Sequence, residues 1–319
     1  MEKPYVMGLD MGGTNSVLGI VDARGHVLAR TSIKTQDYPI ITNYVKALYD
    51  EAIKIVEPLG GMEQIRGIGA GVPDGSYYTG KIEYAPNLPW KGEVPFAQLL
   101  SDQFGIPARI TNDANAAAMG EMTYGAARGM KDFIMITLGT GVGSGIVING
   151  QMVYGHDGFA GELGHTKAVR GENARLCGCG QKGCLEAYAS ANGVARTAKE
   201  IVMTTNEPTL LRELDIDNIT SKDVYDAAVK GDAVAKRIFD FTGRMLGEKF
   251  ADFIAFSSPE AIIMFGGLTK SGDFILKPIV ESMNANVLPH WKDKVKVIFS
   301  DLKESDAAIL GASALAWEL

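Results

Sequence analysis

The pattern of apolar and polar positions predicts strands and helices that alternate along the chain. Tyr5 to Asp10 and Phe133 to Leu138 are compact apolar runs that end at glycine-rich turns, which is typical of buried strands. Further strands are predicted over residues 65–73, 109–113, 261–265 and 295–300, and helices over residues 41–57, 96–104, 114–124, 190–204, 221–230, 232–256, after Gly267 and from residue 306 onward. This alternation predicts the α/β class.

The two opening runs are followed by segments that repeat each other. Gly13 to Val21 and Gly139 to Val147 share the spacing G-T-x4-G-I-V, 126 residues apart. In both places a second turn and a further short apolar stretch follow. A chance match is the alternative, but the shared flanks favour duplication of one α/β unit. We therefore expect two α/β lobes with a ligand-binding cleft between them.

Composition and charge narrow the range of functions. Apolar residues make up 46% of the chain and charged residues 22%, and no apolar run approaches the roughly 18 residues of a membrane span. The formal net charge is −7 without any block of lysine and arginine, so we expect neither a nucleic-acid nor a membrane partner. The opening MEKPYVMGLD does not resemble a signal peptide, which leads us to expect a cytoplasmic protein with reduced thiols.

All three cysteines, Cys177, Cys179 and Cys184, lie in the segment LCGCGQKGC. An odd number of closely spaced cysteines argues against a disulfide framework, whereas thiolates favour zinc, which prefers four tetrahedral ligands. His165, with eleven residues between it and Cys177, is the candidate for the fourth ligand. The spacing therefore predicts a structural Zn²⁺ knuckle, and free buried thiols are the alternative.

The two Gly-Thr turns suggest a phosphate site. Backbone N–H groups of a glycine-rich turn after a buried strand can point at an anion, and a threonine hydroxyl adds a donor. Two such turns facing across a cleft would hold a polyphosphate, although ordinary hairpins are the alternative. A P-loop is excluded because the sequence contains no G-x-x-x-x-G-K-[ST]. Asp10, the last residue of its predicted strand, is a candidate for holding Mg²⁺ through water, or simply a turn residue.

Four polar residues are candidates for chemistry on a hydroxyl group. Asn112 and Asp113 stand where a predicted strand ends and a helix begins, so they are either helix caps or ligands at the carboxyl edge of the sheet. Phosphoryl transfer to an alcohol requires a positioned proton acceptor, and Asp113 is our candidate. Glu162 and Glu186 flank the predicted knuckle. Each alone would be interpreted as a surface carboxylate, but their shared tether to one rigid loop favours sugar binding.

Together these motifs resemble those of the ROK sugar kinases (repressor, open reading frame, kinase) of the actin-like ATPase superfamily. They are Asp10-Met-Gly-Gly-Thr14, Leu138-Gly-Thr-Gly-Val-Gly143, Glu162-Leu-Gly-His165 and Cys177-Gly-Cys-Gly-Gln-Lys-Gly-Cys-Leu-Glu186. The resemblance implies two duplicated actin-like (ribonuclease H-like) lobes with an interdomain cleft. One lobe would contain residues 1–115 and a returning C-terminal helix, 303–319. The other, residues 116–302, would be larger and carry the zinc knuckle.

The resemblance also implies a role for each matching residue. Asp113 would take the proton from the sugar 6-hydroxyl. The implied sugar contacts are Asn112, Glu162, His165, Glu186 and, more loosely, Asn87. The implied contacts to ATP and Mg²⁺ are Asp10, Gly12, Gly13, Thr14, Asn15, Gly139, Thr140, Gly141, Gly143, Gly266 and Gly267. The implied ligands of the structural Zn²⁺ are His165, Cys177, Cys179 and Cys184.

The residues after the knuckle bear on the substrate. Cys184-Leu-Glu-Ala-Tyr-Ala-Ser190 most resembles the glucokinase branch, which implies glucose as the acceptor. N-acetylhexosamine kinase, fructokinase and a non-catalytic sugar sensor are the alternatives. Asp74 departs from the family pattern, which usually has glycine there, close to the sugar pocket. Because the phosphate motif begins at Asp10, we expect no winged helix-turn-helix of the kind that the family's repressors carry, and we expect a homodimer or higher homo-oligomer.

Overall fold

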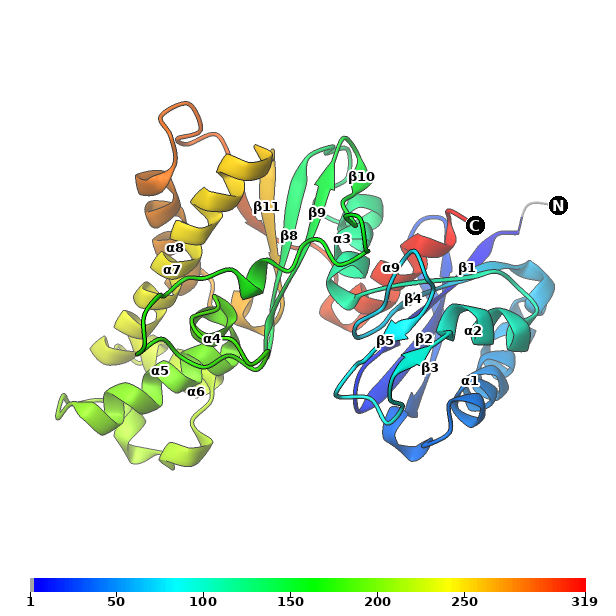
Figure 1. Ribbon diagram of the computed structural model, residues 1–319, viewed down its shortest axis with the longest axis horizontal. Helices are drawn as coiled ribbons and strands as arrows, with labels where there is room; N and C mark the ends of the chain where they lie inside the picture. The colour runs from blue at the N-terminus through cyan, green and yellow to red at the C-terminus, as the bar shows by residue number, and fades with distance from the viewer. Residues whose placement is uncertain (1–2) are drawn as a thin grey trace.

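Two five-stranded sheets form the framework of the protein (Figure 1). The computed structural model describes residues 3–319. The first sheet has the order β3-β2-β1-β4-β7. Its strands are β1 (Tyr5–Met11), β2 (Asn15–Asp22), β3 (Val27–Lys34), β4 (Ile65–Gly71) and β7 (Ala108–Thr111). β2 is antiparallel to β1 and β3, whereas β4 is parallel to β1 and β7.

The second sheet repeats this arrangement in the order β10-β9-β8-β11-β12. Its strands are β8 (Phe133–Leu138), β9 (Val142–Ile148), β10 (Gln151–Met152), β11 (Ala261–Phe265) and β12 (Lys296–Phe299). β9 is antiparallel to β8 and β10, and β11 is parallel to β8 and β12. The same strand order and directions occur in both halves, which confirms the α/β class and the predicted repeat. A small pair, β5 (Ile82–Glu83) and β6 (Glu93–Val94), stands apart from both sheets.

Two helices, α3 (Asp113–Tyr124) and α9 (Glu304–Ala316), lie between the sheets and pack against each other (Figure 1). α9 packs on β1 and β4, and α3 packs on β8 and β9. The contact between α9 and β4 requires glycine, because a Cβ on Gly69 would lie 1.9 Å from the carbonyl oxygen of Ala312. The end of the chain thus returns to the first sheet. The lobe boundaries at 115/116 and 302/303 stay a prediction.

The remaining helices lie on the side of each sheet that faces away from α3 and α9 (Figure 1). They are α1 (Ile41–Val56), α2 (Phe96–Phe104), α4 (Glu186–Ala189), α5 (Ala191–Thr204), α6 (Ser221–Val229), α7 (Ala233–Ser257) and α8 (Asp273–Asn286). In α1 the buried residues Tyr44, Leu48 and Ala52 recur every four positions, so they share the face that meets the sheet. Among residues 3–319, no helix combines the length and apolar character needed to cross a membrane.

Some predicted element boundaries were wrong. β1 continues to Met11, so Asp10 is the penultimate residue of its strand rather than the last. The final helix begins at Glu304 rather than at residue 306. β4 ends at Gly71, because Pro73 has no N–H with which to continue the ladder. The one-turn helix α4 was not expected, since it is too short to show helical periodicity in the sequence.

Candidate active site

A cavity of about 720 Å³ lies between the two halves of the chain and is lined by residues from both. A site of this size, formed where strands of two sheets end, is typical of small-molecule binding. Residues proposed from the sequence that line it are Asp10, Asn87, Asn112, Asp113, Gly139, Thr140, Gly141, Gly143, Glu162, His165, Glu186 and Gly266.

Asp10 and Asp113 meet because neighbouring parallel strands end at the same edge of the first sheet. Asp10 of β1 pairs with Gly71 of β4, and Gly71 pairs with Thr111 of β7. Paired positions on adjacent strands are about 4.8 Å apart, so these three positions form a row across the sheet. Asp113 is the first residue of α3, which follows directly after β7. The topology therefore gathers two carboxylates that are far apart in the sequence.

Asn112 combines the two roles that the sequence left open. It is the N-cap of α3, where its Oδ1 accepts a hydrogen bond from the Asn115 N–H at 2.7 Å. The adjacent Asp113 accepts a hydrogen bond at Oδ1 from the Ala114 N–H at 2.8 Å. The cap interpretation is thus confirmed, yet both side chains also line the cavity. The cap uses an oxygen of Asn112, and its amide nitrogen is a donor that the cap does not use.

The cavity is strongly acidic. Burial, together with repulsion from Asp113, raises the pKa of Asp10 to about 6. Loss of hydration also raises the pKa of Asp113, although hydrogen bonds from the helix N-terminus oppose this shift. Loss of hydration raises the pKa values of Asp74 and Glu162 too, and neighbouring carboxylates add to both shifts. No lysine or arginine is found among the described residues that line the cavity. A ligand that brings hydroxyl donors or a cation would relieve this repulsion.

His165, Cys177, Cys179 and Cys184 form one cluster, whose donor atoms lie within 4.8 Å of one another. The Sγ atoms of Cys179 and Cys184 are 3.7 Å apart, and Cys177 Sγ is 3.8 Å from His165 Nδ1. Sulfur ligands about 2.3 Å from a tetrahedral zinc ion lie about 3.8 Å from one another, so these spacings fit zinc. The cysteines are free thiols, not disulfides. The predicted four-residue cluster is confirmed as an arrangement of side chains.

Glu186 links this cluster to the second Gly-Thr turn. Its Oε2 accepts a hydrogen bond from the Val142 N–H at 3.0 Å, and its Oε1 lies 3.3 Å from Cys177 Sγ. Glu162 is tied to the same cluster from the other side, because its Oε2 lies 3.8 Å from His165 Nε2. Both glutamates line the cavity. The cluster therefore holds two carboxylates that face the same space as Asp113.

The first Gly-Thr turn closes around Gly13 and Thr14. The N–H of Gly12 donates to the carbonyl oxygen of Asn15 at 2.9 Å. The side-chain amide of Gln36 donates to the Gly13 carbonyl and, at 3.2 Å, to the carbonyl oxygen of Asn87. Asn87 is thereby held beside the first turn.

The second Gly-Thr turn is one residue tighter and closes around Thr140. The N–H of Gly139 donates to the carbonyl oxygen of Gly141 at 3.1 Å, and the Gly139 carbonyl accepts from Ala191 N–H at 2.8 Å. Gly266 packs on this turn with a φ of 109°, and a Cβ there would lie 2.6 Å from the Leu138 carbonyl oxygen. Only glycine satisfies both the left-handed backbone and the close approach.

Some predicted residues do not reach the cavity, and others were missed. Gly12, Gly13, Thr14, Asn15 and Gly267 are not among the described residues that line it. The first turn adjoins it through Gly13, where a Cβ would lie 3.1 Å from the carbonyl oxygen of Asn87. Phe159 and Glu121 line the cavity but were not predicted. The available signals were an aromatic between glycines, in Gly158-Phe159-Ala-Gly161, and an acid in a helix rich in alanine.

The repeated sheets, the Gly-Thr turns, the strand-end acids and the cysteine-histidine cluster define a single class of protein. The chain belongs to the ROK family, whose family model matches residues 6–318.

Relatives of known identity extend this assignment. A glucokinase of Halalkalibacterium halodurans is 36% identical over 321 residues, which cover 99% of this chain and 96% of that protein. The crystal structure of a ROK family glucokinase from Streptomyces griseus, in complex with glucose and AMPPNP, matches with a TM-score of 0.80 at 33% identity and covers 99% of this chain and 100% of that one. A xylose repressor of Caldicellulosiruptor bescii is 31% identical over 252 residues, 79% of this chain and 62% of that protein.

Proposed function

We propose that the protein transfers the γ-phosphoryl group of ATP to the 6-hydroxyl of a hexose, with glucose as the preferred acceptor. The observation that carries this proposal is that Asp113, the second Gly-Thr turn and Glu162 and Glu186, which contact the cysteine-histidine cluster, line one cavity. Similarity to glucokinases along nearly the whole chain supports glucose over other hexoses.

Asp113 is the proposed proton acceptor for the sugar hydroxyl. Phosphoryl transfer needs little covalent help from the protein, but it needs an in-line arrangement and a positioned base. Loss of hydration raises the pKa of Asp113, which makes its ionised form a stronger base than an ordinary carboxylate. As the lobes close on both substrates, water is excluded and hydrolysis of ATP is suppressed.

The acceptor is bound by polar side chains around Asp113. The proposed hydroxyl partners are Asn87, Asn112, Glu162, His165 and Glu186. Carboxylate oxygens accept hydrogen bonds from sugar hydroxyls, which also relieves the mutual repulsion of the acids. Asp74 lines the same cavity, so its carboxylate is available to a further hydroxyl.

The donor is bound by the two glycine-rich turns and by Gly266-Gly267. Their backbone N–H groups are the proposed phosphate donors, because the described lining offers no lysine or arginine. Asp10 is the proposed partner of Mg²⁺, which when bound to ATP neutralises charge that develops on the phosphates. An acidic cavity suits this arrangement, since the nucleotide brings its own cation.

Zinc is the proposed occupant of the cysteine-histidine cluster. Four protein ligands complete a tetrahedral shell and leave no open coordination position, so the metal would organise the loop and take no part in the reaction. We further propose a cytoplasmic homodimer or higher homo-oligomer that binds hexose and ATP. The net charge of −7 supports the absence of a nucleic-acid partner.

The test is a coupled ADP-release assay with glucose, mannose, fructose, N-acetylglucosamine, N-acetylmannosamine and allose, each against a control without sugar. We expect the highest kcat/KM with glucose, and phosphate on the 6-hydroxyl of the product by NMR. A preference for fructose or an N-acetylhexosamine would correct the acceptor. Binding of sugar without any ADP release would favour the sensor alternative and refute the kinase.

A further inference from the structure

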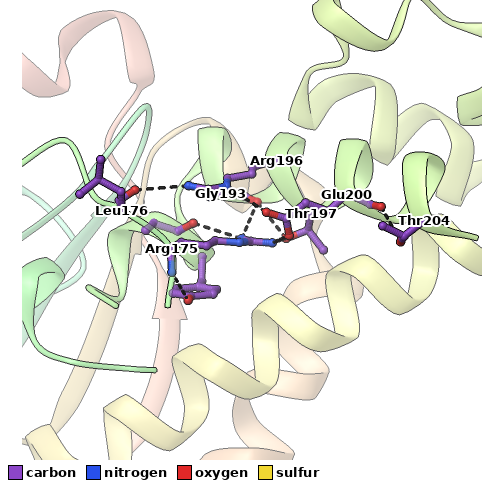
Figure 2. Close-up of polar contacts among 9 residues, drawn as sticks. Arg175, Leu176, Gly193, Arg196, Thr197, Glu200 and Thr204 are labelled. Carbon is purple, nitrogen blue, oxygen red and sulfur yellow. Dashed lines mark hydrogen bonds and ion pairs between the residues drawn. The ribbon is translucent and has the colours of Figure 1, made fainter. Parts of the chain in front are cut away.

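Arg175 is a buried cation beside the cysteine-histidine cluster. The proposed mechanism gives Arg175 no role. The residue is 7% exposed, although it lies in a loop, two positions before Cys177. Figure 2 shows its guanidinium directed toward α5, with hydrogen bonds that fan out to several acceptors. A buried guanidinium is costly unless its donors are satisfied, so this degree of pairing indicates a specific role.

On one side, Arg175 grips the residues that surround Glu186. Its carbonyl oxygen accepts a hydrogen bond from the Gly183 N–H at 2.8 Å, and its own N–H donates to the Tyr188 hydroxyl at 2.8 Å. Its Nη1 donates to the Ala187 carbonyl oxygen at 3.1 Å. The guanidinium carbon also lies 4.6 Å from the centroid of the Tyr188 ring. Arg175 therefore contacts the chain on both sides of Glu186, at Gly183 before it and at Ala187 and Tyr188 after it.

On the other side, the guanidinium is anchored to α5 (Figure 2). Nη1 donates to the Gly193 carbonyl oxygen at 3.4 Å, and Nη2 donates to Thr197 Oγ1 at 2.9 Å and to the carboxylate of Glu200. Glu200 also accepts from Arg196 Nε at 2.9 Å. Because α5 packs against α7 in the core of the second half, it is a rigid base for the loop.

We propose that Arg175 is a positioning residue that sets the carboxylate of Glu186 for the sugar. This inference rests on the proposed function. Glu186 projects from α4, a helix of one turn that cannot hold its own orientation. The cysteine-histidine cluster restrains the chain before Glu186 at Cys184, and Arg175 restrains it after Glu186 at Ala187 and Tyr188. The second Gly-Thr turn is itself held in the β8–β9 hairpin, so nucleotide binding depends less on Arg175.

The test compares Arg175→Met with Arg196→Met in the full chain. Arg196 is the matched control, because it bonds the same Glu200 and the carbonyl oxygen of Leu176 but forms no hydrogen bond with the described residues 183–188. We expect Arg175→Met to raise the KM for glucose by about 10- to 100-fold and to leave the KM for ATP within about twofold. Arg175→Lys should recover part of the loss, and Arg196→Met should leave both values within about twofold.

A double-mutant cycle with Glu186→Gln shows whether Arg175 acts through Glu186. We expect Arg175→Met to add little to the glucose KM once Glu186 is altered, whereas a fully additive effect would overturn the inference. Equal rises in both KM values, or an unchanged glucose KM, would overturn it as well.

If Arg175→Met does not fold, Thr197→Val removes one acceptor and should raise the glucose KM alone by about two- to tenfold, and no change would count against the proposal. A wild-type protein inactive on every hexose would instead refute the proposed function.

Discussion

The two halves of the chain share one framework and differ in what connects its strands. In the first half, residues 35–64 join β3 to β4 and contain little more than α1. In the second half, residues 153–260 join the corresponding β10 and β11 and contain the cysteine-histidine cluster and four helices, α4 to α7. The repeated parts present backbone N–H groups in two Gly-Thr turns, whereas the unequal connection presents side chains. In the proposed function, the duplicated turns would bind phosphate, and the unequal connection would add specificity for a sugar, which is asymmetric.

The acids of the cavity are held in correspondingly different ways. Asp113 belongs to a strand-to-helix junction, and backbone hydrogen bonds at the N-terminus of α3 fix it. Glu162 and Glu186 depend on a loop and on the cysteine-histidine cluster. Changes to the first kind of acid should therefore alter chemistry, and changes to the second should alter sugar binding.

The largest effect is expected at Asp113. Asp113→Asn keeps the shape of the side chain and an oxygen for the Ala114 N–H, but it cannot take a proton. Steady-state kinetics should show kcat lower by about 10² to 10⁴, with the KM for glucose little changed. Asp74→Asn is the matched control, because it removes a charge from the same cavity and should cost less than about tenfold. Normal turnover by Asp113→Asn would remove the base from the mechanism.

Loss of the proposed zinc should affect Glu162 and Glu186, the acids that depend on the cysteine-histidine cluster. Cys179→Ser removes one donor of the cluster, whose Sγ lies 3.7 Å from Cys184 Sγ. The KM for glucose should rise by about 10- to 100-fold, with a smaller change for ATP, because Glu162 and Glu186 lose their tether. Elemental analysis should find one zinc per wild-type chain and less in the variant. Metal-free protein with ordinary glucose kinetics would contradict the role of the cluster.

Replacing Asp10 tests whether its ionised carboxylate lowers the stability of the protein while it supports ATP binding. Its pKa is raised from 3.8 to about 6, so between these values the folded protein binds the proton more tightly than the unfolded chain does. The free energy of unfolding therefore falls as pH rises through that window, and above it the ionised carboxylate is a cost. Asp10→Asn should raise the free energy of unfolding at pH 7 by about 1 to 2 kcal/mol, once solvent in the cavity is allowed for, and by less at pH 4.

Denaturant titrations at the two pH values measure this difference, and a parallel assay should show a higher KM for ATP in Asp10→Asn. Equal changes in stability at both pH values would rule out ionisation of Asp10 as the cause.

The smallest effect is expected at the contact between Glu186 and the second Gly-Thr turn. A Cβ on Gly141 would lie 2.4 Å from Glu186 Oε2, whereas one on Gly139 would meet nothing within 4 Å. Gly141→Ala should therefore raise the KM values for glucose and ATP together, by about two- to tenfold, because it displaces the glutamate and distorts the turn. Gly139→Ala should change the glucose KM less. Equal glucose KM values in the two variants would show that the contact with Glu186 has no consequence.

Local sequence is enough to predict much of this protein. The apolar runs predict the strands of both sheets, and G-T-x4-G-I-V predicts the repeat, because strand and turn preferences act over a few residues. The spacing of His165 and the cysteines likewise predicts their cluster, since the glycines among the cysteines let a short loop wrap around one ion. These features depend on short-range chemistry.

The features that the sequence did not predict depend on packing between distant segments of the chain. The row from Asp10 to Thr111, the bond from the Val142 N–H to Glu186 and the clamp of Arg175 on α5 each join positions that no local pattern relates. Some predicted element boundaries were wrong for the same reason. The one-turn α4, for example, is too short to show helical periodicity and is stabilised by its neighbours. Side chains such as these acquire their partners from the chain's global path, because burial and hydrogen bonding are settled only when distant segments pack together.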